Sequence, residues 1–158
     1  MNISAVMMKS NFKENKKKMT YPEIKYPEIK FTVDGEPVGK GRPRFTRNGH
    51  AYTPEKTADY EELVKLSFRE KYPDFKPFEK DVPLSVIIYA HFPYPKNAGK
   101  TKRMYMIPTK KPDSDNIAKI ICDSLNGIAY HDDSQIVELY VWKRYSENPK
   151  VIVTITEF

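Results

Sequence analysis

The sequence is poor in the residue types that most often build zinc or redox sites. It has 158 residues but only one cysteine, Cys122, and three histidines. A single cysteine excludes an intrachain disulfide, and so few cysteines and histidines exclude a zinc site of the Cys/His type. Any metal chemistry would therefore depend on carboxylate oxygens and would use a hard cation.

Long apolar runs are also missing. No stretch approaches the roughly 20 apolar residues of a membrane span, and residues 1–20 are too polar for a secretory signal. We therefore expect a cytoplasmic protein with no membrane partner. The hydrophobic fraction of 39% and charged fraction of 30% are ordinary for one globular domain, while the net charge of +6 favours an anionic partner.

The beginning of the chain differs from the rest. It is rich in lysine and contains the tandem repeat Tyr-Pro-Glu-Ile-Lys at residues 21–25 and 26–30. Pro22 and Pro27 argue against a helix. We therefore predict a flexible basic tail over residues 1–29 and a folded domain over residues 30–158.

Hydrophobic periodicity predicts an α+β fold, a single compact domain with a mixed four- to five-stranded sheet and two principal helices. Asn48-Gly49 indicates a tight hairpin. Thr53 and Asp115 are candidate N-caps for the two helices, and Gly127 is a candidate C-terminal stop. The expected strands cover residues 30–33, 45–47, 50–52, 84–92, 136–144 and 151–156, and the helices cover 55–71 and 116–126; the last two strands are expected to pair as a closing hairpin across residues 146–149.

Acidic residues gather around the second helix. Asp115, Lys119 and Asp123 recur every four residues, so they share one helical face. That face points away from a buried stripe of Ile117, Ile120, Ile121 and Leu125. Asp113 precedes the face, and Asp132 and Asp133 return to it after a short loop.

Carboxylates at such density repel one another unless a cation neutralises them. A divalent cation such as magnesium would do so and leave positions for water and phosphate, which is the requirement for cutting a phosphodiester. Lys119, beside these carboxylates, can hold a phosphate or stabilise developing charge. The cluster therefore indicates a phosphodiester-cleaving site.

Structural alternatives exist for each part of this cluster. Asp-Xaa-Asp-Asn before a helix is often only a cap or turn. Lys119 and Asp123 could form an exposed helix salt bridge, and Asp132-Asp133 could be a solvated turn. His131 is assigned no role, because a lone histidine is usually structural. Tyr140 and Trp142 could stack on bases or pack in a core or dimer interface.

Basic residues lie in two stretches. The first is PVGKGRPR at residues 37–44, and the second is a loop at 96–112 that has no acidic residue and leads into the carboxylates. Both are candidates for phosphate contacts. The predicted DNA-binding residues are Lys40, Arg42, Arg44, Lys100, Lys102, Arg103, Lys110 and Lys111.

Residues 111–136, KPDSDNIAKIICDSLNGIAYHDDSQI, resemble the signature of the RusA family of Holliday junction resolvases, found in bacteria and often encoded by prophages. DGEPVGKGRPR at residues 34–44 resembles the family's N-terminal segment. The resemblance covers about residues 31–158. The basic extension before it departs from the family pattern.

The resemblance implies a magnesium-dependent endonuclease, with manganese as a substitute, that acts as a homodimer in DNA recombination and repair. It would cut branched DNA, the four-way junction, by paired nicks. The family's essential, metal-binding aspartates fall on Asp113, Asp115 and Asp133 and its catalytic lysine on Lys119, with supporting roles for Asp123 and Asp132. A flap or fork nuclease and a junction-binding protein without cleavage are the alternatives.

Overall fold

A mixed four-stranded sheet with the order β1-β6-β4-β5 organises the fold. The inner strand β4 is parallel to β5 and antiparallel to β6, and β6 is antiparallel to β1. The computed structural model describes residues 28–99, 103 and 105–158. The sheet strands are β1 (Glu28–Asp34), β4 (Leu84–Pro93), β5 (Ile136–Ser146) and β6 (Lys150–Glu157).

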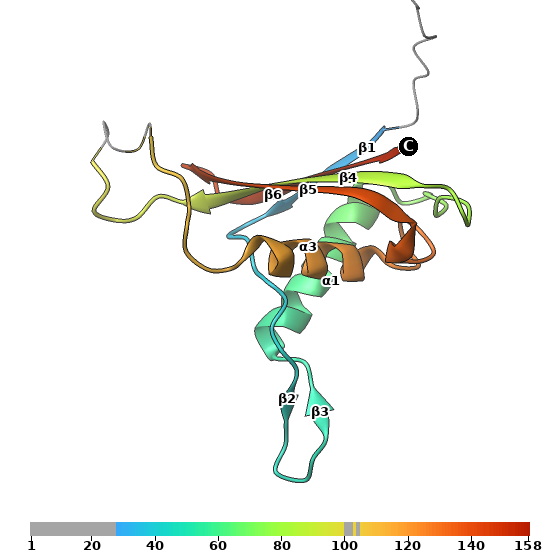
Figure 1. Cartoon of the computed structure of the whole chain (residues 1–158), viewed down its shortest axis with the longest axis horizontal. Helices are drawn as coiled ribbons and strands as arrows, with labels where there is room; N and C mark the ends of the chain where they lie inside the picture. The colour runs from blue at the N-terminus through green and yellow to red at the C-terminus, as the bar shows by residue number, and fades with distance from the viewer. Residues whose placement is uncertain (1–27, 100–102, 104) are drawn as a thin grey trace, which may run out of the picture.

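Two helices, α1 (Glu55–Lys71) and α3 (Ser114–Leu125), lie on the same face of this sheet (Figure 1). A short 3-10 helix, η1 (Asp133–Gln135), directly precedes β5. Over the residues that the structure describes, no helix covers the other face (Figure 1). The α+β class, the mixed sheet and the two principal helices predicted from the sequence are confirmed.

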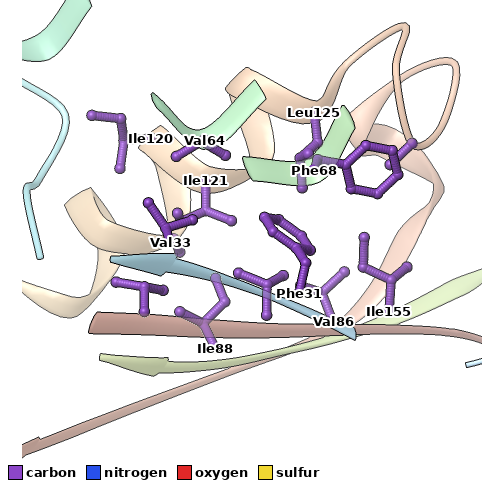
Figure 2. Packing of buried hydrophobic residues seen from close by; sticks show 14 of the residues in the cluster. Phe31, Val33, Val64, Phe68, Val86, Ile88, Ile120, Ile121, Leu125 and Ile155 are labelled. Atoms are coloured by element: carbon purple, nitrogen blue, oxygen red, sulfur yellow. The ribbon is translucent and has the colours of Figure 1, made fainter. Parts of the chain in front are cut away.

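The core fills the space between the sheet and the two helices (Figure 2). Alternate residues of β1, β4 and β6 are buried, as period-two patterning requires. The predicted stripe of α3 is fully buried, and each such leucine or isoleucine stabilises the fold by about 1.5–3 kcal/mol. The residues of this stripe are Ile117, Ile120, Ile121 and Leu125. The helix that carries the acidic residues is therefore fixed to the sheet.

A small hairpin, β2 (Arg44–Phe45) and β3 (Ala51–Tyr52), stands away from the sheet and helices (Figure 1). Its turn is longer than the two-residue turn expected, because Thr46 pairs with His50 through a 2.8 Å hydrogen bond from Thr46 N to His50 O. Only Gly49 adopts a positive φ, +81°. The loop therefore has the three-residue form with a glycine bulge, which uses Asn48-Gly49 differently from a two-residue turn.

The expected hairpin of the last two strands is wrong. β5 and β6 both pair with β4 and lie on opposite sides of it. A parallel pair needs a long crossover, and α3 with its flanking loops supplies one between β4 and β5. The link at residues 147–149 therefore passes the end of β4 instead of forming a tight turn.

Helix and strand starts also differ from the expectations. Asp113, and not Asp115, is the N-cap of α3, and α1 begins after Pro54 without a side-chain cap from Thr53. β1 begins at Glu28, so the last two residues of the expected tail belong to the sheet; the rest of that tail, residues 1–27, lies outside the described residues. None of the described helices has the length and apolar character to cross a bilayer.

Candidate active site

A hollow of about 350 Å³ lies between α3 and the first residues of β5. Asp115, Lys119 and Asp123 of α3 and Asp133 of η1 supply its polar lining. The α3 residues are four positions apart, so they form one row on the side of the helix away from the buried stripe. The structure thus brings these four predicted residues together.

The remaining wall of the hollow is mainly apolar and includes Val137 and Leu139 of β5. The register of β5 against β4 shifts here, because Leu84 pairs with Ile136 but Ser85 pairs with Glu138. Val137 is therefore the extra residue of a bulge, a device that redirects side chains and is common beside active sites. Sequence reasoning missed this wall. The adjacent apolar pair Ile136-Val137, which breaks the strand alternation, was the signal for it.

Asp132 and Asp133 are neighbours with different surroundings. Asp132 is the N-cap of η1, and its Oδ1 accepts a hydrogen bond from Ser134 N at 2.9 Å. Hydrogen bonding to Ser134 lowers the pKa of Asp132 below its ordinary value. Asp133 lines the hollow, whereas Asp132 is outside its lining. The structure gives Asp132 a structural role in the loop that presents Asp133.

Asp113 precedes the first turn of α3, but its side chain makes no capping hydrogen bond. It is exposed, lies two residues before Asp115, and is outside the lining of the hollow. The backbone before it is held by Lys143 of β5, whose Nζ donates to the carbonyl oxygens of Lys110 at 2.6 Å and Pro112 at 2.8 Å. Sequence reasoning missed Lys143, since a lysine in a strand usually faces solvent.

Lys40, a predicted phosphate contact, is ion-paired inside the fold. Its Nζ lies 2.8 Å from Asp123 Oδ2 and 2.6 Å from Glu61 Oε1. Burial lowers the pKa of Lys40, but the hydrogen bonds to Asp123 and Glu61 outweigh burial and raise the pKa above its ordinary value. Asp123 thus pairs with a lysine from a distant segment instead of forming the helix salt bridge with Lys119 that was the alternative.

The two glycines beside Lys40 allow this segment to lie against both helices. A Cβ at Gly39 would come within 2.6 Å of Pro112 Cβ, and one at Gly41 within 2.7 Å of Thr57 Oγ1. Lys40 N also donates to Asn116 O at 2.8 Å. The Gly-Lys-Gly sequence is therefore explained by close packing next to the site.

A comparison with known proteins identifies the family of the chain. The family model described as Endodeoxyribonuclease RusA matches residues 34–156, most of the chain. The chain belongs to the RusA family. The resemblance found in the sequence is confirmed, and the family is one of endodeoxyribonucleases.

Two relatives are similar to the chain. It is 40% identical over 139 residues to the uncharacterized protein YqaN of Bacillus subtilis (strain 168), which covers 82% of this chain and 96% of that protein. It is 35% identical over 81 residues to the crossover junction endodeoxyribonuclease rusA of Lactococcus phage r1t, which covers 51% of this chain and 59% of that protein.

The donors of this RusA-family site fit a hard divalent cation. Among the described residues, no group of three or more His, Cys, Asp or Glu side chains is placed to hold a metal ion by itself. Asp115 and Asp133 nevertheless offer carboxylate oxygens to one hollow. Magnesium is commonly held by one or two carboxylates, with water and substrate phosphate as its other ligands. Two carboxylates in an open hollow satisfy that requirement.

Cys122 also lines the hollow but is not suited to act as a nucleophile. Burial, together with the negative charges of Asp133 and Asp123, raises the pKa of its thiol to about 12. A thiol with so high a pKa is protonated at neutral pH, and the thiolate is the reactive form. The other polar side chains that line the hollow are the carboxylates of Asp115, Asp123 and Asp133 and the amine of Lys119.

The predicted DNA-binding residues have several environments. Arg42, Lys110 and Lys111 are exposed. Arg103 is tied to its own chain by hydrogen bonds to Glu147 and to Ala98 O, and it packs over the Tyr94 ring. Lys100 and Lys102, and the side chain of Arg44, lie outside what the structure describes.

The strand aromatics lie on the sheet face opposite the helices. Tyr140 and Trp142 are 47% and 45% exposed, so they do not belong to the core of the described chain. Trp142 stacks on Tyr89 of β4, with 6.4 Å between ring centroids, and Arg144 lies over the Trp142 ring. Base stacking and a dimer interface are the two alternatives that this exposure favours.

Proposed function

We propose that this chain is a magnesium-dependent, structure-specific endodeoxyribonuclease of the cytoplasm that resolves four-way DNA junctions in recombination and repair. The observation that carries the proposal is the meeting of Asp115, Lys119 and Asp133 at one hollow in a chain of the RusA family. The name of the phage relative, a crossover junction endodeoxyribonuclease, supports the choice of substrate.

The metal would be held by Asp115 and Asp133, with Asp113 as a further carboxylate donor from the start of α3. When bound, magnesium or manganese activates water and neutralises charge on the scissile phosphate. Asp115 is held by a helix whose other side is buried, and Asp133 by a capped loop. Both donors are therefore presented by ordered backbone, which metal and substrate positioning requires.

Lys119 would contribute a fixed positive charge beside the phosphate. It lies one helical turn from Asp115 and lines the same hollow. Asp123, the helical neighbour that could have paired with Lys119, already has Lys40 as a positively charged partner at 2.8 Å. Lys119 can thus interact with the substrate and stabilise negative charge in the transition state.

DNA contacts would come from exposed basic residues on both sides of the site. Lys110 and Lys111 lead directly to Asp113, while Arg42 and Arg47 are exposed at the base and turn of the β2–β3 hairpin. Arg44, Lys100 and Lys102 add to these stretches by sequence. Such contacts release counterions, so binding should weaken steeply with added salt.

The active form would be a homodimer with two-fold symmetry. A four-way junction has two equivalent strands to cut, and the described residues of one chain form one such acidic hollow. Two-fold dimers are the commonest oligomers. The exposed aromatic face of the sheet, with Tyr89, Tyr140 and Trp142, is a surface on which a second copy can pack.

The proposal is tested by comparing cleavage of a mobile four-way junction, a flap and a linear duplex, each with and without magnesium. We expect metal-dependent paired nicks in the junction and little cleavage of the duplex. Preferential cutting of the flap would support a flap nuclease instead, and tight junction binding without cleavage would support a binding protein.

The dimer is tested with a mixed assembly of one active subunit and one Asp115→Asn subunit. This dimer should nick one strand of a junction without resolving it, whereas two active subunits should give paired nicks. Full resolution by the mixed dimer, or efficient resolution by a verified monomer, would contradict the two-site mechanism.

A further inference from the structure

The amide of Gln135 bonds to four backbone groups around Asp133. Its Oε1 accepts hydrogen bonds from His131 N at 2.9 Å and Asp132 N at 3.4 Å. Its Nε2 donates to Glu79 O at 2.9 Å and Val82 O at 3.1 Å. The two ends of one side chain thus join the loop that carries Asp133 to a second, distant loop.

That second loop is attached to the core. It leads directly into β4, the inner strand of the sheet, and its Val82 packs against the buried cluster. At its start, Phe78 N donates to Ala129 O at 2.9 Å, and Phe78 is itself buried. Gln135 therefore links the Asp133 loop to a point that cannot move without disturbing the core.

We infer that Gln135 is a positioning residue that fixes Asp133 for metal and phosphate, an inference that rests on the proposed function. Asp133 lies between two anchored residues, since Asp132 caps Ser134 N and Gln135 is bonded at both ends. Its own side chain is left to line the hollow. Groups that orient metal ligands from outside typically affect metal affinity or activity by about 10- to 100-fold.

The chemistry of the amide makes glutamine specific here. The oxygen faces two N–H groups and the nitrogen faces two carbonyl groups, so each half has the partner that it needs. A glutamate can still accept from His131 and Asp132 but cannot donate to Glu79 and Val82. A methionine keeps the length of the side chain and loses both halves.

The test compares Gln135→Met and Gln135→Glu with the parent and with Tyr72→Phe. Tyr72 is a matched control, because its hydroxyl joins the C-cap of α1 to β1 through 3.0 Å hydrogen bonds with Lys30 N and Lys30 O. The change to phenylalanine removes two tertiary hydrogen bonds away from the hollow. A general loss of stability should therefore affect the control as much as Gln135→Glu, which also loses two hydrogen bonds.

Three measurements separate positioning from stability. Calorimetric titration with manganese alone, without DNA, should show about 10- to 100-fold weaker binding for Gln135→Met and an intermediate or equal loss for Gln135→Glu. Amide hydrogen exchange in metal-free protein should accelerate at His131 and Asp132 in Gln135→Met. The single-turnover rate at saturating junction should fall in both glutamine variants, while Tyr72→Phe should match the parent in all three measurements.

The following outcomes would contradict the inference about Gln135 or the proposed function. Parental manganese affinity in a folded Gln135→Met protein, or an equal loss in Tyr72→Phe, would overturn it. If Gln135→Met does not fold, parental affinity in Gln135→Glu would overturn it as well. A parent that binds manganese but cuts no branched DNA would refute the proposed function, while the manganese titration would still judge Gln135. A parent that binds no manganese would refute both.

Discussion

Asp113 and Asp132 occupy the same position in two different regions of the molecule, each directly before the first turn of a helix. The carboxylate of Asp132 caps η1 through Ser134 N, whereas the side chain of Asp113 makes no capping hydrogen bond to α3. The two sequences around them look alike in composition. The difference is that the carboxylate of Asp132 accepts a hydrogen bond from a backbone N–H of its own helix, whereas that of Asp113 does not.

The same contrast separates two lysines near the site. Lys40 is paired with Asp123 and Glu61, while Lys119 lines the hollow with Asp115 and Asp133. A charged side chain that is ion-paired within the fold contributes to its structure. A charged side chain that is exposed at the hollow is available to a metal or a substrate. The following changes test this division, from the largest expected effect to the smallest.

The largest contrast should be between adjacent aspartates. Asp133→Asn should abolish cleavage while junction binding persists, because it removes a charged metal donor without touching the basic residues. Asp132→Asn should cleave at close to the parental rate, since an amide oxygen can still cap Ser134 N. Single-turnover cleavage and gel-shift binding measure both. Equal defects in the two variants would mean that the division between them is wrong.

Asp113→Asn tests whether Asp113, an N-cap residue whose side chain makes no capping hydrogen bond, is part of the site. We expect loss of cleavage with an unchanged free energy of unfolding, because the Asp113 side chain makes no capping hydrogen bond that the change could remove. Cleavage rates and urea unfolding are the measurements. Asp115→Asn, which removes a carboxylate inside the hollow, is the positive control. Normal cleavage by Asp113→Asn would leave Asp115 and Asp133 as the metal donors.

Lys119→Ala should lower the single-turnover rate by about 100-fold, the usual scale for losing one group that stabilises transition-state charge. Junction affinity and helicity should change little, because alanine is an excellent helix former. Lys119→Arg should restore part of the rate by returning the charge. A parental rate for Lys119→Ala would reduce Lys119 to a solvated side chain.

Lys40→Met and Arg42→Met form a matched pair two residues apart. Lys40→Met should lower the free energy of unfolding by about 1 to 2 kcal/mol, since Asp123 and Glu61 would then repel each other half-buried. Arg42→Met should leave stability unchanged and reduce the slope of log affinity against log salt by about one unit. Urea unfolding and binding at several salt concentrations distinguish them; interchanged results would assign Lys40 to the DNA.

The smallest expected effect is the pH dependence of the η1 cap. The pKa of Asp132 is lower in the folded protein than its ordinary value of 3.8. Its stabilising contribution is therefore full above that value and is lost as the pH falls toward the folded pKa. Asp132→Asn should make this loss slightly smaller in urea unfolding between neutral pH and about pH 3. An unchanged acid dependence would show that the charge of Asp132 adds nothing to stability.

Local patterns were sufficient for most of the fold. The stripe of Ile117, Ile120, Ile121 and Leu125 identified the buried face of α3, and the strand expected over residues 84–92 is β4. The expectation about strand pairing failed because pairing depends on distant partners. The sequence Ser146-Glu147-Asn148-Pro149 does not reveal that β5 and β6 both pair with β4. A short segment of this kind can join two neighbouring strands of a hairpin or two strands that lie on either side of a third.

The sequence placed several acidic residues near one another but not their individual environments. Helical spacing put Asp115, Lys119 and Asp123 in one row, and these three line the hollow together with Asp133, whereas Asp113 and Asp132 lie outside its lining. The pairing of Lys40 with Asp123 depends on a segment more than eighty residues away in sequence. The contacts of Gln135 from the loop of Asp132 and Asp133 to the turn before β4 likewise join residues more than fifty positions apart.

The crossover position of α3 has a consequence for the motions of the site. This helix links the inner strand β4 to the parallel edge strand β5, and its whole apolar stripe is buried. It therefore cannot detach without opening the core. The amide protons in the middle of α3 should then exchange with solvent only as fast as the entire domain unfolds, while those of the β2–β3 hairpin should exchange through local opening. Lys119, in the middle of α3, would then be carried on a slowly exchanging part of the chain, to which the substrate must adapt.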